Sequence, residues 1–463
     1  MASDHDELWA CSAVELARKV RSREVSSREI VEAHLARVES VNPKVNAIVE
    51  VLAEGARASA DAADQAVSGG EELGPLHGVP VTVKQNIDVA GTATTLGLAA
   101  FKDAIAPCDG PPVERLREAG AIILGRTNLP DVALRWHTDS GLAGATLNPW
   151  DPAVSPGGSS GGEAVCLATG MSPLGIGTDL GGSVRIPAGA CGVVSLKPTW
   201  GRVADMSVVA PPPTRGIAQM DTTGPLARSV ADLRVAFDVL RRPSDRDPRY
   251  RAAEVADESR PPVRYAVSIP DGTHPEIAAA VLSATSALEG AGWTRSDEDP
   301  PDLGEAFEAW LAVIGHDVAE SLPVLGQVCG EQARQFLDIM TAVIPTIDDA
   351  AFDELIGPRR FEQAERWARF QQTVPLVVTP VLTQPTFAPG LDLVDPMAVT
   401  ESVACIPPVN FLGLPAAAVP VGRVDGVPVG AQLIGPARRE DVCLDAGNAI
   451  EQAMRRVLPI DPR

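Results

Sequence analysis

PGGSSGG at residues 156–162 and GTDLGGSVRIP at residues 177–187 are the most informative stretches of this 463-residue sequence. Each contains a serine, Ser159 or Ser183, that is embedded in glycines. Glycine lets the backbone approach closely and adopt positive φ, and successive N–H groups of such a turn can converge on an anion. A serine beside that turn has what acyl transfer requires, a nucleophile next to donors for an oxyanion. Gly-Ser runs are more often flexible loops, but the apolar residues around both stretches disfavour that interpretation.

A lysine that follows an apolar segment is the candidate base for such a serine. The segment Gly78-Val79-Pro80-Val81-Thr82-Val83 leads into Lys84 and predicts a short buried strand. Burial disfavours the ammonium form, so a lysine at this place can be neutral and accept a proton. Lysines at strand ends also extend to the surface, and Lys84 alone does not decide between the two.

Helices and apolar strands alternate along the chain. Helices are expected to begin at capping boxes formed by Ser12 with Glu15 and Ser26 with Glu29, and an alanine-rich helix is expected to end at Gly69-Gly70. The pattern further predicts helices at 113–119, 275–292, 305–372 and 440–457, and strands at 81–84, 121–124, 375–380 and 416–421. The fold class is therefore α/β, with a mixed β-sheet core covered by helices on both faces.

We expect one large domain over residues 1–463, because no linker or internal repeat divides the chain. Residues 240–262 are charged and poorly patterned, and we interpret them as a surface connection. Residues 203–217, with three consecutive prolines, are expected to form a rim over the site. The domain is expected to consist of an N-terminal helical cover (1–70), a catalytic core (74–200), a mostly helical cover on the substrate side (240–372), and a segment that completes the sheet and ends in a helix (373–463).

The acidic charge excludes several classes of partner. The chain has 39 Lys and Arg against 61 Asp and Glu, a net charge of −22. A nucleic acid or an anionic membrane requires a basic surface, so neither is expected to bind. The seven cysteines are scattered without a CxxC pair, which indicates reduced thiols. The start MASDHDELWA does not resemble a secretion signal, and no apolar run could span a membrane, so we expect a cytoplasmic protein.

Several common catalytic motifs are missing from the sequence. The six histidines are scattered, without HExxH or a pair at helical ligand spacing, so no metal is expected. There is no GxxxxGK[ST] motif and no GxGxxG after a strand, which disfavours a nucleotide. No GxSxG elbow with a histidine partner stands out either. We therefore expect a hydrolase without a cofactor.

Together, Lys84 and the two Gly-Ser runs resemble the amidase signature family. The resemblance extends over nearly the whole chain and rests on several motifs in the same order. Besides the two runs, the matching stretches are LHGVPVTVKQNID (76–88), TNLPD (127–131), NPWD (148–151), CG (191–192), LKPT (196–199), GPLARSV (224–230), GLPA (413–416) and GVPVGAQLIG (426–435).

The resemblance implies a Ser–Ser–Lys triad and an amidase signature fold. Ser183 would be the nucleophile, Ser159 the bridging residue after a cis peptide bond with Gly158, and Lys84 the neutral base. The oxyanion hole would be formed by four backbone N–H groups, those of Leu180, Gly181, Gly182 and Ser183. The residues expected to support the triad are Ser160, Asp179 and Thr178.

Neighbouring residues have more than one interpretation. Asp179 either orients the hole or only forms a turn, and Ser160 either supports Ser159 or only fits a tight backbone. Arg185 is expected to pair with a buried carboxylate rather than with substrate. Cys166 and Cys191 lack a basic neighbour in the sequence, which favours buried packing over a nucleophilic role.

The pocket is less readable than the triad. Residues 133–138 lie where the family lines its acyl pocket, and Trp136, Trp150 and Trp200 are candidate lining residues. The sequence departs from the family pattern at QMDTTGP (219–225) and at Trp200 after Lys-Pro-Thr. Neither departure is expected to touch the triad, and both bear on the choice of substrate.

The family resemblance leaves three functions open. The first is a hydrolase of carboxylic amides, whose acyl-enzyme chemistry would also serve esters, anilides and carbamates, with only the small substrate and water as partners and a homodimer allowed. The second is the A subunit of a tRNA-dependent amidotransferase. The third is an inert module of the same fold, which the joint presence of Lys84, Ser159 and Ser183 disfavours.

Overall fold

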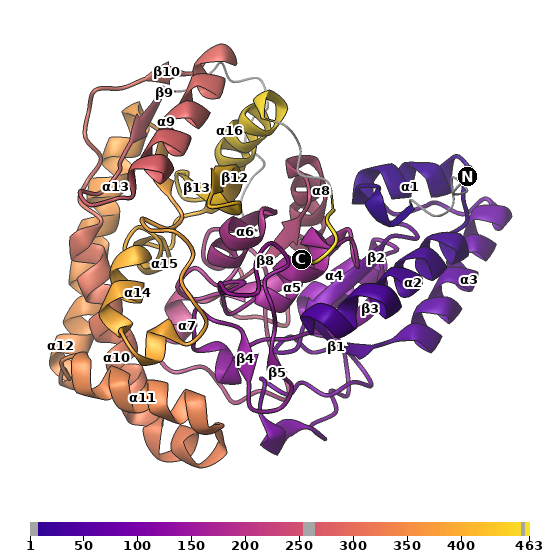
Figure 1. Cartoon of the computed structure of the whole chain (residues 1–463), viewed down its shortest axis with the longest axis horizontal. Coiled ribbons are helices and arrows are strands. Elements are labelled where there is room, and N and C mark those ends of the chain that lie inside the picture. Colours follow the sequence, from indigo (N-terminus) through magenta and orange to yellow (C-terminus); the bar gives the residue numbers. More distant parts are fainter. Residues whose placement is uncertain (1–7, 253–263, 455–458) are drawn as a thin grey trace.

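A mixed β-sheet runs through the centre of the molecule, with helices on either side (Figure 1). The computed structural model describes residues 8–252, 264–454 and 459–463. In these residues the strand order is β1-β3-β2-β6-β8-β7-β12-β13-β11-β9-β10. The strands are β1 (Ile48–Val51), β2 (Pro80–Lys84), β3 (Ile122–Thr127), β6 (Leu174–Asp179), β7 (Val194–Lys197), β8 (Thr222–Ala227), β9 (Arg264–Val267), β10 (Thr294–Arg295), β11 (Leu376–Pro380), β12 (Ala416–Val424) and β13 (Val427–Ile434); β4 (Asp139–Ser140) and β5 (Gly144–Ala145) pair separately.

The pairing of β2 places the site at one edge of the sheet. β2 runs parallel to both of its neighbours, β3 and β6, whereas β6 with β8 and β12 with β13 are antiparallel. The carboxyl ends of parallel strands lie at the same edge, where α/β proteins bind ligands. Lys84 ends β2 and Asp179 ends β6, so the lysine and the second Gly-Ser run meet there.

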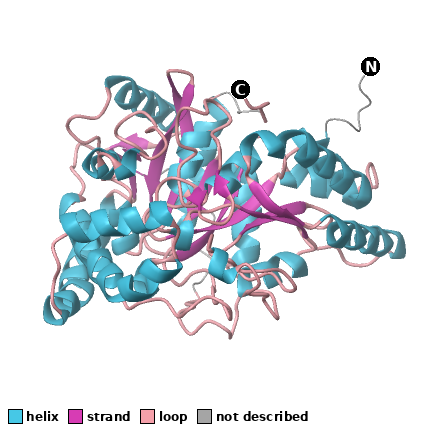
Figure 2. Ribbon diagram, turned by 60° about the horizontal axis from the view of Figure 1, so that its bottom comes forward, coloured by secondary structure: helices cyan, strands magenta, loops and turns pink. Residues whose placement is uncertain are grey.

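Helices cover both faces of the sheet, as the sequence predicted (Figure 2). Alternate residues of β3 enter different cores: Ile123 belongs to the core that also contains residues of α1, α4, α8, α9 and α16, and Leu124 to the core that contains residues of α2, α3, α5 and α6. The helices are α1 (Ala13–Arg21), α2 (Ser27–Val45), α3 (Ala53–Gly69), α4 (Pro111–Glu118), α5 (Gly161–Ala168), α6 (Arg185–Cys191), α7 (Ile217–Met220), α8 (Val230–Leu240), α9 (Pro275–Gly290) and α16 (Glu440–Ala453).

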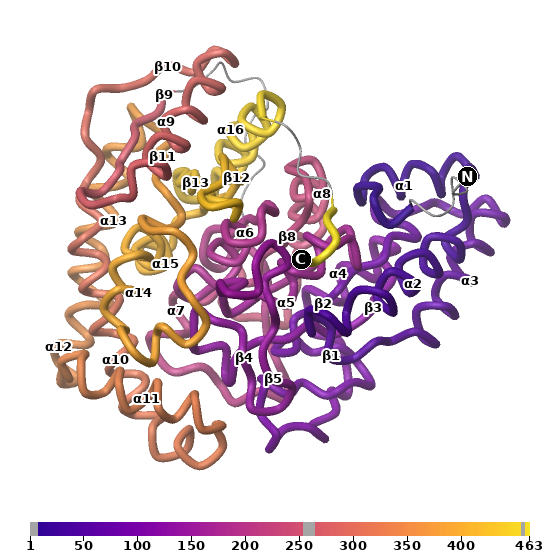
Figure 3. Tube along the Cα trace, in the orientation of Figure 1, coloured from indigo at the N-terminus to yellow at the C-terminus, as the bar shows by residue number. Residues whose placement is uncertain are grey.

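A third core lies under a layer of later helices, drawn in orange shades on the left of Figure 3. Trp310, Leu337 and Trp367 from this layer pack with residues of β11, β13 and α15. The pattern at 305–372 is therefore helical, but it is not one helix, because Gly330 and the segment 344–348 interrupt it. The elements are α10 (Gly304–Val328), α11 (Glu331–Val343), α12 (Asp349–Glu354), a π-helical turn (Leu355–Arg359), α13 (Arg360–Thr373), α14 (Pro396–Ser402) and α15 (Pro407–Phe411).

The local signals at the amino end are confirmed. Ser12 and Ser26 each form the predicted capping box, and Gly70 takes the left-handed conformation just after α3. The prediction that the last helix continues to residue 457 falls partly on residues 455–458, which lie outside the described part. No helix in the described residues is both long and apolar enough to cross a bilayer.

Candidate active site

Lys84 is buried at the end of β2 and faces Ser159. Its Nζ lies 2.7 Å from Ser159 Oγ and 3.0 Å from Thr178 Oγ1, and the lysine is 0% exposed. Loss of solvation lowers the pKa of Lys84 to about 7, although the charges of Asp221, Asp179 and Glu163 oppose that shift. The alternative of a lysine extending to the surface is thus wrong, and a neutral amine is accessible near pH 7.

The two Gly-Ser runs meet in space. The Ser160 N–H donates to the Ser183 carbonyl oxygen at 3.0 Å, and the Gly158–Ser159 peptide bond is cis. Gly158 admits no side chain, because a Cβ there would lie 2.6 Å from the Arg135 carbonyl oxygen. The Ser160 backbone therefore joins the two runs, and its hydroxyl donates to the Thr178 carbonyl oxygen at 3.4 Å.

Thr138, from the predicted pocket segment, supports the same turn. Its Oγ1 donates to the Gly157 carbonyl oxygen at 2.8 Å and accepts from the Gly161 N–H at 3.1 Å. Part of residues 133–138 thus holds the Ser159 turn rather than lining the cavity.

Asp179 organises the turn that carries Ser183. Its carboxylate accepts from the Gly182 N–H at 2.8 Å and the Val184 N–H at 3.1 Å. Arg185 binds the same carboxylate through Nε and Nη2, at 3.1 and 2.8 Å, and both side chains are fully buried. Burial alone would raise the pKa of Asp179, but the Arg185 guanidinium outweighs it and holds the pKa below its usual value. The expectation that Arg185 pairs with a buried carboxylate is confirmed.

The same contact corrects the expected set of free amides. Gly182 was expected to contribute its N–H to an oxyanion hole, but this N–H is already donated to Asp179. Within the part of the chain that the structure describes, the N–H groups of Leu180, Gly181 and Ser183 have no protein acceptor. The turn therefore offers three open amides, and Asp179 does more than form a turn.

A cavity of about 1010 Å³ opens above these groups. Ser159, Ser183, Thr178, Leu180 and Gly181 lie on its wall, and Ser183 is 6% exposed while Ser159 is 0% exposed. The segment 203–217, which was expected to form a rim over the site, contributes residues to the cavity wall. The other lining side chains are mostly apolar and include Leu134, Trp136, Met206, Pro211, Trp310, Ile314, Val318, Phe336 and Met340.

Two tryptophans fix the peptide groups of the turn. Trp310 Nε1 donates to the Leu180 carbonyl oxygen at 3.0 Å, and Trp136 Nε1 donates to the Gly181 carbonyl oxygen at 2.9 Å. Their rings stack with centroids 6.1 Å apart, and a Cβ on Gly181 would lie 2.5 Å from the Trp310 ring. Both indole N–H groups are thereby used by the backbone, so the rings present apolar surface to the cavity.

The other candidate residues divide between packing and the pocket. Trp150 is buried and donates to the Cys191 carbonyl oxygen, and Trp200 donates to the Ala218 carbonyl oxygen. Neither is among the cavity-lining residues, so that prediction is correct for Trp136 alone. Cys166 and Cys191 are buried, and loss of solvation raises the pKa of each thiol. This confirms packing as their role.

Asp221, within the stretch 219–225, was not among the expected site residues. It lies on the cavity wall, and its charge favours the ammonium form of Lys84. Burial raises the pKa of Asp221 in turn. Two functional residues were missed. Asn86 donates to Thr178 Oγ1 at 2.9 Å and lines the cavity, and its place two residues after Lys84 was the one signal that could have pointed to it. For Trp310, which also lines the cavity, the sequence offered no signal.

Comparison with known proteins identifies the class and then the family. The chain is 39% identical to an indoleacetamide hydrolase of Bradyrhizobium diazoefficiens, over 96% of this chain and 86% of that protein. The solved structure of 6-aminohexanoate cyclic dimer hydrolase with substrate has a TM-score of 0.84 and 29% identity, and covers 98% of this chain and 99% of that one. The protein is thus an enzyme that cleaves amide C–N bonds. The amidase family profile matches residues 29–444, and the chain belongs to this family, the amidase signature enzymes.

A second group of relatives has a different function. The A subunit of the glutamyl-tRNA(Gln) amidotransferase from a Synechococcus species is 33% identical, over 95% of this chain and 96% of that protein. This chain matches both the hydrolase and the amidotransferase subunit over most of their length, so the extent of the match does not distinguish the two functions.

Proposed function

We propose that this enzyme hydrolyses small, uncharged amides with an aromatic acyl group, through an acyl-enzyme on Ser183. The observation that carries the proposal is the 2.7 Å contact between Lys84 and Ser159 at the base of a cavity that Ser183 also lines. A buried, neutral amine beside a hydroxyl is what activates a serine when no histidine is present. In this proposal Ser183 is the nucleophile, Ser159 is the bridging residue and Lys84 is the base.

The proposed reaction uses these three side chains. Lys84 accepts the proton of Ser159 as Ser159 accepts that of Ser183, and Ser183 Oγ attacks the amide carbon. The ammonium returns the proton through Ser159 to the leaving nitrogen, so the C–N bond breaks and the amine departs. Water then attacks the ester by the same relay and releases the acid. Esters, anilides and carbamates need no other catalytic group.

The oxyanion is assigned to the open amides of the turn. The N–H groups of Leu180, Gly181 and Ser183 are available, and Asp179 with Arg185 holds the turn in place without entering the reaction. Because these donors are fixed before the substrate arrives, they need little reorganisation as charge develops.

The cavity supports an aromatic, uncharged acyl group. Its wall includes the two indole rings and Leu134, together with the exposed carboxylates of Glu308 and Glu401. Exposed carboxylates on the wall repel an anionic substrate. The similarity to an indoleacetamide hydrolase points to the same class, an arylacetamide.

A hydrolysis screen on the purified chain alone tests this proposal. We expect turnover of indole-3-acetamide and phenylacetamide, measured as released ammonia, and at least about 100-fold lower kcat/KM for succinamic acid, an anionic amide. Hydrolysis of glutamine only, and only when partner subunits and charged tRNA are added, would instead identify the chain as part of an amidotransferase. Equal rates with the anionic amide would refute the assignment of the cavity.

Trp310→Phe is expected to lower kcat about 10-fold with little change in KM. The Trp310 N–H polarises the peptide group whose N–H belongs to Gly181, and the loss of a direct oxyanion donor costs about 10²–10³-fold. Steady-state kinetics with an arylacetamide measures the effect. Trp136→Phe is the matched control, because its indole polarises the Gly182 N–H, which Asp179 already holds. Equal losses of kcat in the two variants would contradict the assignment.

A further inference from the structure

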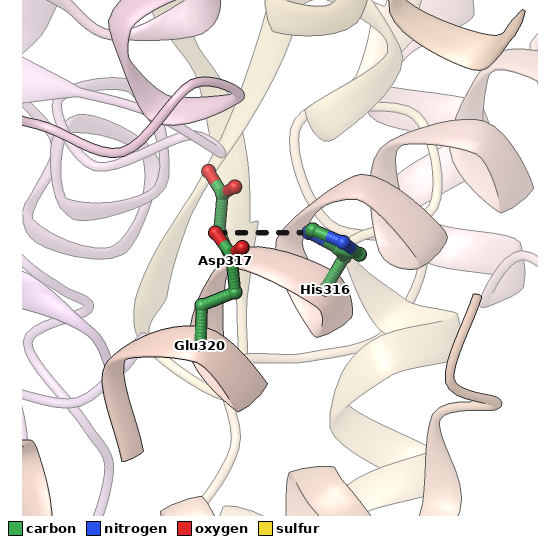
Figure 4. Close-up of side chains that lie close together, drawn as sticks. All are labelled: His316, Asp317 and Glu320. Atoms are coloured by element: carbon green, nitrogen blue, oxygen red, sulfur yellow. Dashed lines mark ion pairs between the residues drawn. The ribbon is translucent and has the colours of Figure 1, made fainter. Parts of the chain in front are cut away.

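Three polar side chains that are not part of the triad gather on one turn of α10. His316, Asp317 and Glu320 each offer one ligand atom, and these atoms lie within 4.8 Å of one another. Figure 4 shows the His316 imidazole and the Glu320 carboxylate facing each other, with the Asp317 carboxylate beside them. Glu320 lies four residues after His316 and three after Asp317, the spacings that place side chains on the same side of a helix, so α10 brings Glu320 near both residues.

Two of the atoms in this cluster are buried without a hydrogen-bond partner in the described residues. They are His316 Nδ1 and Asp317 Oδ1. The His316 side chain is 9% exposed and Asp317 is 1% exposed, so solvent does not satisfy these atoms well. A buried, unpaired acceptor is unfavourable, and such groups normally have a partner. A bound cation would supply that partner for both atoms at once.

The opposite atoms of the same side chains are held by outer contacts. His316 Nε2 lies 3.5 Å from Asp349 Oδ1, which favours the proton on Nε2 and leaves a lone pair on Nδ1. Asp317 Oδ2 accepts from the Ile217 N–H at 2.9 Å and from the Thr214 hydroxyl. In metal sites, a carboxylate often accepts a hydrogen bond from the second nitrogen of the ligating imidazole, and ligating carboxylates accept hydrogen bonds on their other oxygen. These contacts orient the metal ligands.

We propose that His316, Asp317 and Glu320 bind a divalent transition-metal ion such as Zn²⁺. One imidazole nitrogen and two carboxylate oxygens are a ligand set that zinc accepts, with water in the fourth position. The Glu320 side chain is 51% exposed, which gives the ion a path from solvent. Arg215 lies beside the cluster, but its charge is paired with Asp349 and Asp353. The sequence offered no signal, because only one histidine takes part.

The ion would fasten the cavity rim to the helical cover. Asp317 already joins α10 to Thr214 and Ile217, and it lies on the cavity wall. A cation on its free oxygen would hold that carboxylate in place from the other side. The site takes no part in the proposed hydrolysis, so its test does not depend on that proposal.

Titration of the chelator-treated full chain with Co²⁺ and Zn²⁺ tests the site. We expect one Co²⁺ per chain, with the weak visible absorption of nitrogen and oxygen ligands and no thiolate charge-transfer band. His316→Ala and Glu320→Gln should each weaken binding at least about 10-fold. Asp338→Asn, on the exposed face of α11, is the matched control and should bind as the wild type does. Zn²⁺ should raise the Tm of the wild type but not that of His316→Ala.

Three results would overturn this assignment. They are no Co²⁺ binding up to millimolar concentration, unchanged affinity in Glu320→Gln, and a thiolate band that disappears in Cys108→Ser. Because the Glu320 side chain is half exposed, Glu320→Gln is not expected to disturb folding, which keeps the test decisive even where His316→Ala is unstable.

Discussion

Ser183→Ala abolishes amide hydrolysis while the fold and the binding of substrate persist: this is the largest effect we expect. The substitution removes the only atom that forms the acyl bond, and in other serine hydrolases the loss of the nucleophile costs on the order of 10⁶-fold in kcat. The lost hydroxyl is small and borders the cavity, so packing is little affected. Ammonia release with an arylacetamide measures the rate, and thermal unfolding measures the stability.

Ser195→Ala is the matched control for this change. Ser195 is fully buried on β7, its hydroxyl has no hydrogen-bond partner in the described part of the chain, and it lies outside the site. It should therefore retain wild-type kcat. A fluorophosphonate should label the wild type at Ser183 and should not label Ser183→Ala. Turnover by Ser183→Ala within 10-fold of the wild type would exclude Ser183 as the nucleophile.

Lys84→Met should lower kcat/KM by about 10²–10⁴-fold at pH 7, and the remaining kcat/KM should no longer fall as the pH is lowered below 7. The competent base is the neutral amine, and the pKa of Lys84 is lowered to about 7 by burial. In the wild type, kcat/KM should therefore fall about tenfold per pH unit below pH 7 and level off above it. Methionine keeps the buried volume, so unfolding is not the expected cause of the loss.

Two further variants test whether the fall of kcat/KM below pH 7, the acid limb of the pH profile, is due to Lys84. The charge of Asp221 favours the ammonium, so Asp221→Asn should lower the pKa of Lys84 and move the limb to lower pH. Lys197→Met is the control, because burial also lowers the pKa of Lys197 to about 7, at a place where its Nζ donates to the Pro198 carbonyl oxygen. If Lys197→Met shifts the limb and Asp221→Asn does not, Lys84 is not the base.

The groups near the triad could be predicted because their signals are local. Lys84 stands at the end of an apolar strand, and each serine stands in its own glycine-rich run. The meeting of these segments depends on β2 and β6 being parallel neighbours, which the sequence pattern favours but does not specify. The motifs of the family resemblance, rather than periodicity, indicated that they converge.

The walls of the cavity could not be predicted for a physical reason. Trp310 reaches Leu180 across 130 residues of sequence, and nothing in an amphipathic helix tells which apolar residue touches a distant turn. The use of the Gly182 N–H by Asp179 depends on the exact path of the turn. The influence of the Asp221 charge on Lys84 likewise depends on their distance in space, which the sequence does not give.

The cavity walls and the catalytic groups belong to different parts of the chain. The groups that act on the bond come from the end of β2, the turn before α5 and the turn between β6 and α6, whereas most of the apolar wall comes from α10, α11 and the segment 203–217. Substrate range can therefore diverge in descendants of this gene without loss of the reaction. A directed-evolution library confined to Ile314, Val318, Phe336 and Met340 would sample new acyl groups while every member keeps the same chemical machinery.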